Sequence, residues 1–482
     1  MTGSNQQPRV LITKELVVQF VVIAICLIMP VFLVTDLQLL PFMIIAAAIF
    51  GLLILKKPFI GLIIYIFVFY IRPQEIWFTG AVALERTIGI ALLVLTLLRM
   101  KLKDDFRFKI TNIHIAILAF LVVALINVTT SFWISASWDS WVKLLRLFVV
   151  FFCVVHLIDN EKQFKFFILF TILGTAFHAT SAVINYYNGI VEVEMGIERA
   201  FAMDTSYGDP NSLAATIVYT LPLIYYYFTR KTPGWTRILL IGIMLISVWC
   251  VILTGSRTGM AGVIVFGVMA IWGRPNRIRN FILVAVALVS LALLTPGEYQ
   301  QRFESITNFD TRHDQSGAAY SARSRWIFMK YGFQMLLTRP LTGYGMGNFA
   351  TTMGMVYNQS WLQAHTLPAQ IMGEMGMTGI IAFTLWIVIL FMNIKKLRLY
   401  FKKSENQFMY NMTAAMKAHL ILMFFMGLGG HNLFRYNWFI ISAIIVLLLK
   451  REISGYGERL PEPENIASSP EVKLIPVDIP RE

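Results

Sequence analysis

The chain has 482 residues, of which 57% are hydrophobic and 14% are charged, and its mean hydropathy is +0.66. Many apolar runs reach the length that a helix needs to cross a bilayer, so this composition excludes a soluble enzyme and predicts a polytopic membrane protein. The formal net charge of +14 could indicate nucleic-acid binding. Basic cytoplasmic loops explain it better, and we expect membrane lipids but no nucleic acid as partners.

Hydropathy predicts an all-α polytopic fold with about 12–14 transmembrane helices. The first apolar run is too long for a signal peptide and lacks a small-residue cleavage site, so we interpret it as a mature helix. The runs 58–71 and 258–273 are short enough to be tilted or re-entrant. In chain order, the candidate spans are 16–34, 39–55, 58–71, 81–98, 112–130, 141–158, 164–185, 210–228, 237–254, 258–273, 281–295, 371–394, 413–430 and 437–449.

Basic residues fall in alternate connections between these spans, which places them on one side of the membrane if the N-terminus starts there. The positive-inside rule makes that side the cytoplasm. The long polar segment 295–370 is then an extracytoplasmic loop, and the Pro- and Glu-rich tail 455–482 is a disordered cytoplasmic segment. We therefore divide the chain into N-terminal helices (1–190), a core with the loop (191–450) and the tail. The basic connections are KK (56–57), RMKLKDDFRFK (99–109), NEKQFK (160–165), TRKTPGWTR (229–237), RPNRIRN (274–280), KKLRLYFKK (395–403) and KRE (450–452).

The outer connections carry almost only arginine among their positive residues, with Lys330 as the exception. The topology rule treats lysine and arginine alike, so it does not explain this bias. A planar guanidinium fork suited to phosphate oxygens would explain it. We expect Arg302, Arg312 and Arg339 to be surface residues. The outer arginines are Arg72, Arg199, Arg257, Arg302, Arg312, Arg323, Arg325, Arg339 and Arg435.

Two turns on the outer side precede the loop. Arg199 stands before GDPNSLA (208–214), where Asp209 suits a helix N-cap and Pro210 the first helical turn. That interpretation leaves Arg199 unexplained. In LTGSRTGMAG (253–262), glycines bracket Ser256 and Arg257 at the outer end of a span. A snorkelling arginine is as good an interpretation as a tight turn that binds an anion.

The loop itself contains two further motifs. The stretch 321–338 is typical of an amphipathic helix at the membrane surface, and the Gly-rich GYGMGNF follows Pro340. Arg323 and Arg325 are two residues apart, so at most one should point into a site. The second motif, AHTLPAQIMGEMGMTG (364–379), puts His365 at the water boundary before a span.

Charged and titratable residues near that span are the remaining candidates. Glu374 lies inside the following helix, where a carboxylate is costly unless paired, and we expect an arginine from another segment as its partner. His431 lies beside Arg435 at the outer end of its span and is a supporting candidate, while His178 and His419 have weaker context.

Metal and cofactor motifs are absent from the sequence. There is no HExxH, no Cys cluster, no DxD and no Walker A motif. Cys26, Cys153 and Cys250 all lie inside apolar runs and are expected to be buried rather than ligands. We expect no metal and no cofactor, so the energy must come from an activated substrate or a gradient.

Taken in order, these segments resemble the O-antigen ligase / Wzy-type O-antigen polymerase superfamily (Wzy_C-type membrane domain). That family combines an Arg before a PN-containing helix start, a TGSR-like turn, an Arg-containing loop helix with a PLTGxGxGNF-like stretch, and a His before an E-x-G-x-x-G helix. Here the pattern is carried by Arg199 with DPNSLA, TGSRTG, Arg325 with PLTGYGMGNF, and AHT with GEMGMTG. Departures are a longer segment before Pro210, Met329 where an aromatic is frequent, and Thr366 where Asn is frequent.

The resemblance implies a GT-C-like, metal-independent glycosyltransferase in the bacterial inner membrane, with its active site facing the periplasm or the cell exterior. The implied donor is a glycan on undecaprenyl pyrophosphate, and the implied acceptor is lipid A–core or another lipid-linked glycan. His365 is then expected to accept the hydroxyl proton, and arginines to stabilise the leaving pyrophosphate. The implied clamps are Arg199, Arg257, Arg325 and Arg323, with Ser256, Glu374, His431 and Arg435 in support.

Several functions stay open at this stage. An O-antigen ligase, an O-antigen or exopolysaccharide polymerase and a protein O-glycosylation ligase differ in their acceptor, which lies outside the shared motifs. A transporter or flippase of lipid-linked oligosaccharides is the alternative from another class. Such a transporter should show an internal repeat with paired broken helices, and the sequence shows none.

Overall fold

The structure is a computed structural model, and it describes residues 51, 56–72, 84–102, 110–194, 197–202, 208–229, 232–272, 317–404 and 406–457. The candidate spans 16–34, 39–55 and 281–295 lie wholly or largely outside these residues. So do the loop segment 295–316, with Arg302 and Arg312, and nearly all of the predicted tail. The expected total of about 12–14 spans is therefore not tested.

The described part is mostly helical, as the hydropathy pattern predicted. Five helices, α6, α7, α8, α10 and α16, are long and apolar enough to cross a membrane. The elements are α3 (Pro58–Ile71), α5 (Leu84–Leu102), α6 (Asn112–Thr129), α7 (Ile134–Leu157), α8 (Glu161–Tyr187), β1 (Glu192–Glu194), β2 (Ile197–Arg199), α9 (Pro210–Tyr226), α10 (Gly234–Leu253), α11 (Arg257–Trp272), α14 (Gly317–Thr338), α15 (Phe349–Met355), α16 (Leu367–Lys403), α17 (Gln407–Gly427), α18 (Asn437–Leu449) and α19 (Arg451–Ser454).

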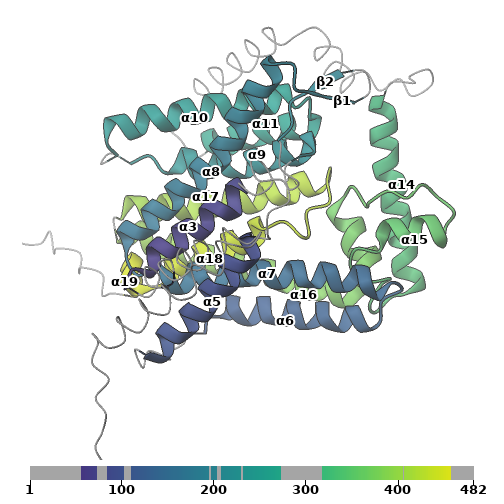
Figure 1. Ribbon diagram of the computed structural model, residues 1–482, viewed down its shortest axis with the longest axis horizontal. Helices are drawn as coiled ribbons and strands as arrows, with labels where there is room; N and C mark the ends of the chain where they lie inside the picture. Colours follow the sequence, from purple (N-terminus) through teal and green to yellow (C-terminus); the bar gives the residue numbers. More distant parts are fainter. Residues whose placement is uncertain are drawn as a thin grey trace, which may run out of the picture.

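The long helices form a bundle, and α14 stands across one end of it (Figure 1). Helices α6, α7 and α16 run alongside one another, while α14 and α15 lie at the end where α6 finishes and α16 begins. We call this the site end. A helix turned across the ends of the spans matches the predicted amphipathic helix 321–338, which the structure extends to Gly317.

The centre of the bundle is built on α18. This helix is apolar on nearly all sides and almost entirely buried, as expected for a helix surrounded by other helices. Trp386 of α16 packs beside it, and its indole nitrogen donates to the hydroxyl of Ser442 at 3.1 Å. Trp386 and Trp438 are among the largest fully buried side chains. This core fixes the register between α16 and α18, because the second residue of α18, Trp438, packs against Phe383 near the middle of α16.

One short hairpin departs from the all-α expectation. Strands β1 and β2 pair antiparallel, with Glu192 opposite Arg199. Three residues per strand are too few for an alternating pattern to be seen in the sequence. The hairpin continues into the bundle, because the amide of Ala200 donates to the carbonyl of Leu253 at 2.9 Å. It thereby places Arg199 against the end of α10.

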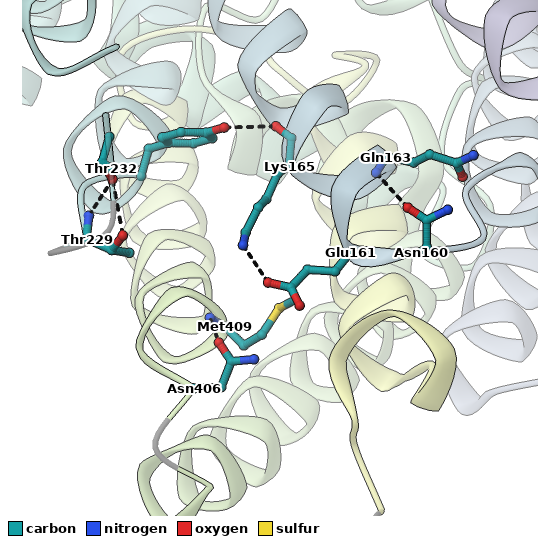
Figure 2. Close-up of polar contacts among 9 residues, drawn as sticks. Asn160, Glu161, Gln163, Lys165, Thr229, Thr232, Asn406 and Met409 are labelled. Atoms are coloured by element: carbon teal, nitrogen blue, oxygen red, sulfur yellow. Dashed lines mark hydrogen bonds and ion pairs between the residues drawn. The ribbon is translucent and has the colours of Figure 1, made fainter. Parts of the chain in front are cut away.

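The opposite end of the bundle is held by ordinary helix caps and a surface ion pair (Figure 2). Asn160 accepts from the amide of Gln163 at the start of α8, and Asn406 does the same for Met409 at the start of α17. Lys165 and Glu161 pair at 2.5 Å across one turn of α8. These are the contacts expected of exposed helix starts, and they point to no binding site at this end.

Candidate active site

Arg325 is brought from the loop helix to the start of another span. Its guanidinium Nη2 lies 3.5 Å from the hydroxyl of Thr258 in the first turn of α11. Burial lowers the pKa of Arg325 below its ordinary value. Trp326 and Lys330 are exposed on the other face of α14. The side chain of Arg323, the other arginine of this motif, lies outside the described residues.

Arg257 is the first residue of α11, in the turn predicted at TGSRTG. Gly255 has φ +60°, a conformation that glycine adopts without strain. The hydroxyl of Ser256 is buried and accepts from the amide of Gly259 at 3.2 Å, so Ser256 caps α11. Arg257 is half-buried next to Thr258. The turn therefore places Arg257 in the first turn of α11, and the guanidinium of Arg325 lies against the same turn, where the helix dipole also favours anions.

Arg199 is completely buried and joins two of the predicted turns. Its Nε donates to the carbonyl of Thr254 at 2.7 Å, and its Nη2 donates to the Asn211 side-chain oxygen at 3.0 Å. Thr254 ends α10, and Asn211 lies in the first turn of α9. Sequence reasoning gave Arg199 the role of a pyrophosphate ligand. Two of its hydrogen bonds hold the TGSR turn against the start of α9, and the role as a pyrophosphate ligand stays a prediction.

Two arginines form hydrogen bonds to side chains in the first turn of α9. Asp209 accepts from the amide of Ser212 at 2.8 Å and is the N-cap, and Pro210 is the first helical residue, as predicted. The hydroxyl of Ser212 also receives a hydrogen bond from Nη2 of Arg435. Arg435 therefore reaches the same helix start that Arg199 reaches through Asn211. The Asp209 carboxylate accepts hydrogen bonds from Asn211 and Ser212, the two residues that these arginines contact.

His365 and His431 lie face to edge, with ring centroids 5.9 Å apart. His365 also contacts Phe328 of α14 at 5.4 Å, and its backbone has φ +47°, which is uncommon outside glycine. Such a conformation costs free energy and is often kept where a side chain must be aimed. The next residue, Thr366, caps α16 by accepting from the amide of Ala369.

Both residues are exposed at the protein surface, yet the surrounding protein disfavours the charged forms of their side chains. Burial lowers the pKa of His365 below its ordinary value of 6.5, and the charge of Arg325 lowers it further, while Asp209 opposes this. The pKa of His431 is lowered to about 4, mainly by burial and further by the charges of Arg435 and His365. A ring that is accessible but neutral is suited to accept a proton. The same causes show that Asp209, Arg325, His365, His431 and Arg435 form one electrostatic cluster.

Among the described residues, Glu374 forms no ion pair with an arginine, contrary to the sequence-based expectation. Its carboxylate accepts from the Gln370 amide at 3.4 Å, and the backbone amides of Gly347 and Phe349 face it. The oxygen of Gln370 in turn accepts from the amide of Leu433 at 3.3 Å. The other carboxylate oxygen is buried and has no hydrogen-bond partner among the described residues, so this group is only partly compensated. Glu374 therefore connects the Gly-rich stretch to the segment that carries His431.

The Gly-rich stretch 340–349 is held by helices from the first part of the chain. Asn127 of α6 accepts from the amide of Met346 at 2.9 Å and donates to the carbonyl of Glu374 at 3.0 Å. Ser137 of α7 donates to the carbonyl of Met346 at 2.9 Å. Sequence reasoning missed both residues. The available signal was the amide of Asn127 inside an apolar run, which in a membrane span marks a polar contact.

Other residues considered from the sequence have structural contacts. Arg339 lies over the ring of Tyr344 at 4.9 Å and donates to the carbonyl of Thr130 at 3.4 Å, so it anchors the Gly-rich stretch rather than lying free on the surface. His178 bonds to the carbonyl of Tyr70 at 2.6 Å, and His419 stacks on Tyr219 in the core. Among the described residues, no three His, Cys, Asp or Glu side chains are grouped to hold a metal ion.

We predict that Gly376→Ala destabilises the protein by disturbing the packing of the Gly-rich stretch against α16. Gly376 has φ +61° and ψ −156° inside α16, a region nearly restricted to glycine. An added Cβ would lie 2.7 Å from the amide nitrogen of Gly343 and 2.8 Å from the carbonyl oxygen of Leu341. The backbone conformation alone should cost about 1–3 kcal/mol. The measurement is the midpoint of thermal unfolding in detergent.

Gly242→Ala is the matched control for this variant. Gly242 lies in α10 with no atom within 4 Å of an added Cβ, so alanine should leave the midpoint unchanged or raise it slightly. Equal midpoints of thermal unfolding for Gly376→Ala and Gly242→Ala would mean that the non-helical backbone at Gly376 is not needed for the stability of the protein.

The fold and the site define a multi-pass membrane protein with an arginine and histidine cluster at one end of its bundle. Residues 242–384 match the family model described as O-antigen ligase, and this part of the chain belongs to the O-antigen ligase / Wzy superfamily. Residues 34–232 match a family of unknown function (DUF5935). No curated protein matches the chain. The O-antigen ligase segment contains Arg257, Arg325 and His365, whereas Arg199, His431 and Arg435 lie outside it.

Proposed function

We propose that this protein is a glycosyltransferase that moves a glycan from undecaprenyl pyrophosphate to an acceptor hydroxyl at the outer face of the bacterial plasma membrane. The observation that carries the proposal is the neutral, solvent-accessible His365 within electrostatic reach of Arg325, at the end of a membrane bundle. Both residues lie in the segment that matches O-antigen ligase.

The charge distribution supports an outward-facing site. Lysines and arginines gather at the opposite end of the bundle, for example in the last turns of α5 and α16. The site end carries arginines that are mostly engaged with protein groups. By the positive-inside rule, the lysine-bearing end faces the cytoplasm. The predicted topology with an extracytoplasmic loop agrees with this orientation.

The proposed chemistry uses each part of the cluster. The acceptor oxygen attacks the anomeric carbon, the bond from that carbon to the phosphate oxygen breaks, and the hydroxyl proton passes to His365. Because burial and Arg325 keep His365 neutral, its ring can take this proton. Negative charge grows on the leaving pyrophosphate, and Arg257 and Arg325 at the start of α11 would stabilise it. Arg199 and Arg435 would hold these elements in position.

The acceptor defines the choice among an O-antigen ligase, a polymerase of O-antigen or exopolysaccharide, and a protein O-glycosylation ligase. The O-antigen ligase match favours transfer to lipid A–core. A flippase for lipid-linked oligosaccharides remains the alternative from another class, and it would move its substrate unchanged.

Product analysis tests the proposed function. The purified protein is placed in liposomes with undecaprenyl-pyrophosphate-linked glycan and lipid A–core, both isolated from a strain that lacks the gene. We expect free undecaprenyl pyrophosphate to appear together with glycan attached to the acceptor, and protein-free liposomes to yield neither. Movement of intact donor across the bilayer without new product would instead identify a flippase.

A further inference from the structure

A cavity of about 180 Å³ lies beside His365, between α14, α15 and the segment that follows α15. Its volume is below the roughly 300–1,000 Å³ of sites for drug-sized ligands, so it suits a single ring rather than a whole oligosaccharide. Phe328 forms part of its wall and also contacts the His365 ring at 5.4 Å. A ligand in this cavity would therefore be separated from His365 by one aromatic side chain.

The lining of the cavity is uncharged. Ser324, Gln359 and Ser360 supply hydroxyl and amide groups, and Ile327, Phe328 and Leu362 supply apolar surface. Phosphate sites are built from guanidinium, ammonium or clustered backbone amides, and none of the described residues that line this cavity is charged. Hydroxyls and an amide beside an aromatic ring instead match the hydroxyls and the apolar face of a sugar.

Helix α14 separates this cavity from the arginines. Arg325 follows Ser324 and is therefore turned by about 100° around the helix axis. Arg325 approaches Thr258 on α11, whereas Ser324, Ile327 and Phe328 line the cavity on the side of α15. One face of α14 therefore lies toward the place proposed for the leaving pyrophosphate, and the adjacent face of α14 lines the uncharged cavity.

The wall opposite α14 is held in place by its own contacts. The amide of Gln359 donates to the carbonyl of Met353 at 2.9 Å, and one side-chain N–H of Gln359 donates to the carbonyl of Tyr357 at 3.2 Å. A primary amide has a second N–H and an acceptor oxygen that can serve a ligand. Trp361 packs over Gly354, where an added Cβ would come within 2.2 Å of the indole. The pocket is therefore formed before a ligand enters it.

We propose that this cavity binds one uncharged sugar ring of the acceptor, next to the acceptor sugar whose hydroxyl reaches His365 past Phe328. The proposal rests on the proposed function, since it assigns the acceptor side of the same reaction. The two substrates would then lie against different faces of α14. The anionic donor would lie on the face that carries Arg325, and the acceptor sugar on the adjacent face that lines the cavity.

Protection of a cysteine from alkylation tests occupancy of the cavity. Ser360→Cys is made together with Cys26→Ser, because the remaining Cys153 and Cys250 are buried. The rate of labelling by N-ethylmaleimide is measured with lipid-free surface oligosaccharide from the same strain, and with inorganic pyrophosphate. The oligosaccharide should slow labelling and pyrophosphate should not. Protection by pyrophosphate, or none by oligosaccharide up to its solubility limit, overturns the proposal.

Gln359→Leu distinguishes an acceptor sugar from a donor sugar. Loss of one neutral hydrogen bond should raise the oligosaccharide concentration for half-maximal transfer by about tenfold and leave the KM for the lipid-linked donor unchanged. Gln363→Leu, in the same segment but outside the lining, should change neither value. A rise in the donor KM instead would assign the cavity to the donor glycan and overturn the acceptor assignment.

The two proposals fail in different ways. Absence of glycan transfer by the unaltered protein overturns the proposed function and the acceptor role with it. Intact transfer overturns the cavity assignment alone if oligosaccharide leaves the labelling of the Ser360→Cys variant unchanged, or if Gln359→Leu keeps the acceptor requirement of the unaltered protein.

Discussion

Replacing His365 by asparagine should lower the rate of glycan transfer by about 10²–10⁴-fold, the range expected when a general base is lost. Asparagine tolerates the left-handed backbone at φ +47° and keeps hydrogen-bonding capacity, but it cannot take a proton near neutral pH. The variant should therefore keep its fold and its donor binding while losing turnover. The measurement is the initial rate of undecaprenyl pyrophosphate release with both substrates saturating.

Asn358→Ala controls for backbone strain in the same segment. Asn358 also has a positive φ of 50° and is exposed away from the histidine pair, so alanine there introduces strain without removing a base. We expect its transfer rate to stay near that of the unaltered protein. If His365→Asn retained full activity, His365 would have no part in the mechanism.

Replacing Arg325 by glutamine should lower kcat by about 10²–10³-fold, the loss typical of one preorganised group that stabilises developing negative charge. It should also move the acidic limb of the pH profile. Arg325 lowers the pKa of His365, so without this positive charge that pKa rises toward its ordinary value of 6.5. His365 then becomes protonated at a higher pH, and activity is lost at a higher pH on acidification. The measurement is kcat between pH 4.5 and 8, a range chosen to bracket about two units below the reference pKa.

Lys330→Gln removes the same charge from the same helix. Lys330 is exposed on α14, so its loss changes the net charge of the site end without touching α11. We expect a normal kcat and an unshifted profile. A comparable defect in Lys330→Gln would show that Arg325 acts through the overall positive potential rather than through its place beside Thr258.

Much of the helical framework was predictable from hydropathy. The span 437–449 coincides with α18, because an apolar helix that ends at charged residues has clear limits. The predicted span 371–394 falls short of α16, which runs from Leu367 to Lys403. Its last residues are basic, and a hydropathy window stops at charges even where the backbone stays helical. Likewise, α7 begins at Ile134, seven residues before the predicted span, among serines that the window treats as loop.

The sequence could name the candidate residues of the site, but it could not predict which residues they contact. The order of motifs named Arg257, Arg325 and His365, and the structure brings them to one end of the bundle. The order of motifs could not show that Arg199 is buried against Thr254, because local sequence carries no information on a partner 55 residues away. The same limit explains Glu374, which faces the backbone amides of Gly347 and Phe349, and no side-chain pattern reveals such neighbours.

The attachment of the Gly-rich stretch to Asn127 and Ser137 has a consequence for how such proteins can diversify. The segment that matches O-antigen ligase begins at residue 242, yet its Gly-rich stretch is bonded by helices from the segment that matches a family of unknown function. The two segments therefore cannot be exchanged independently between relatives. A chimaera would inherit the Gly-rich stretch without the groups that bond to it, unless the donor of its first half carried an equivalent amide and hydroxyl. We therefore expect the two halves to have been inherited together.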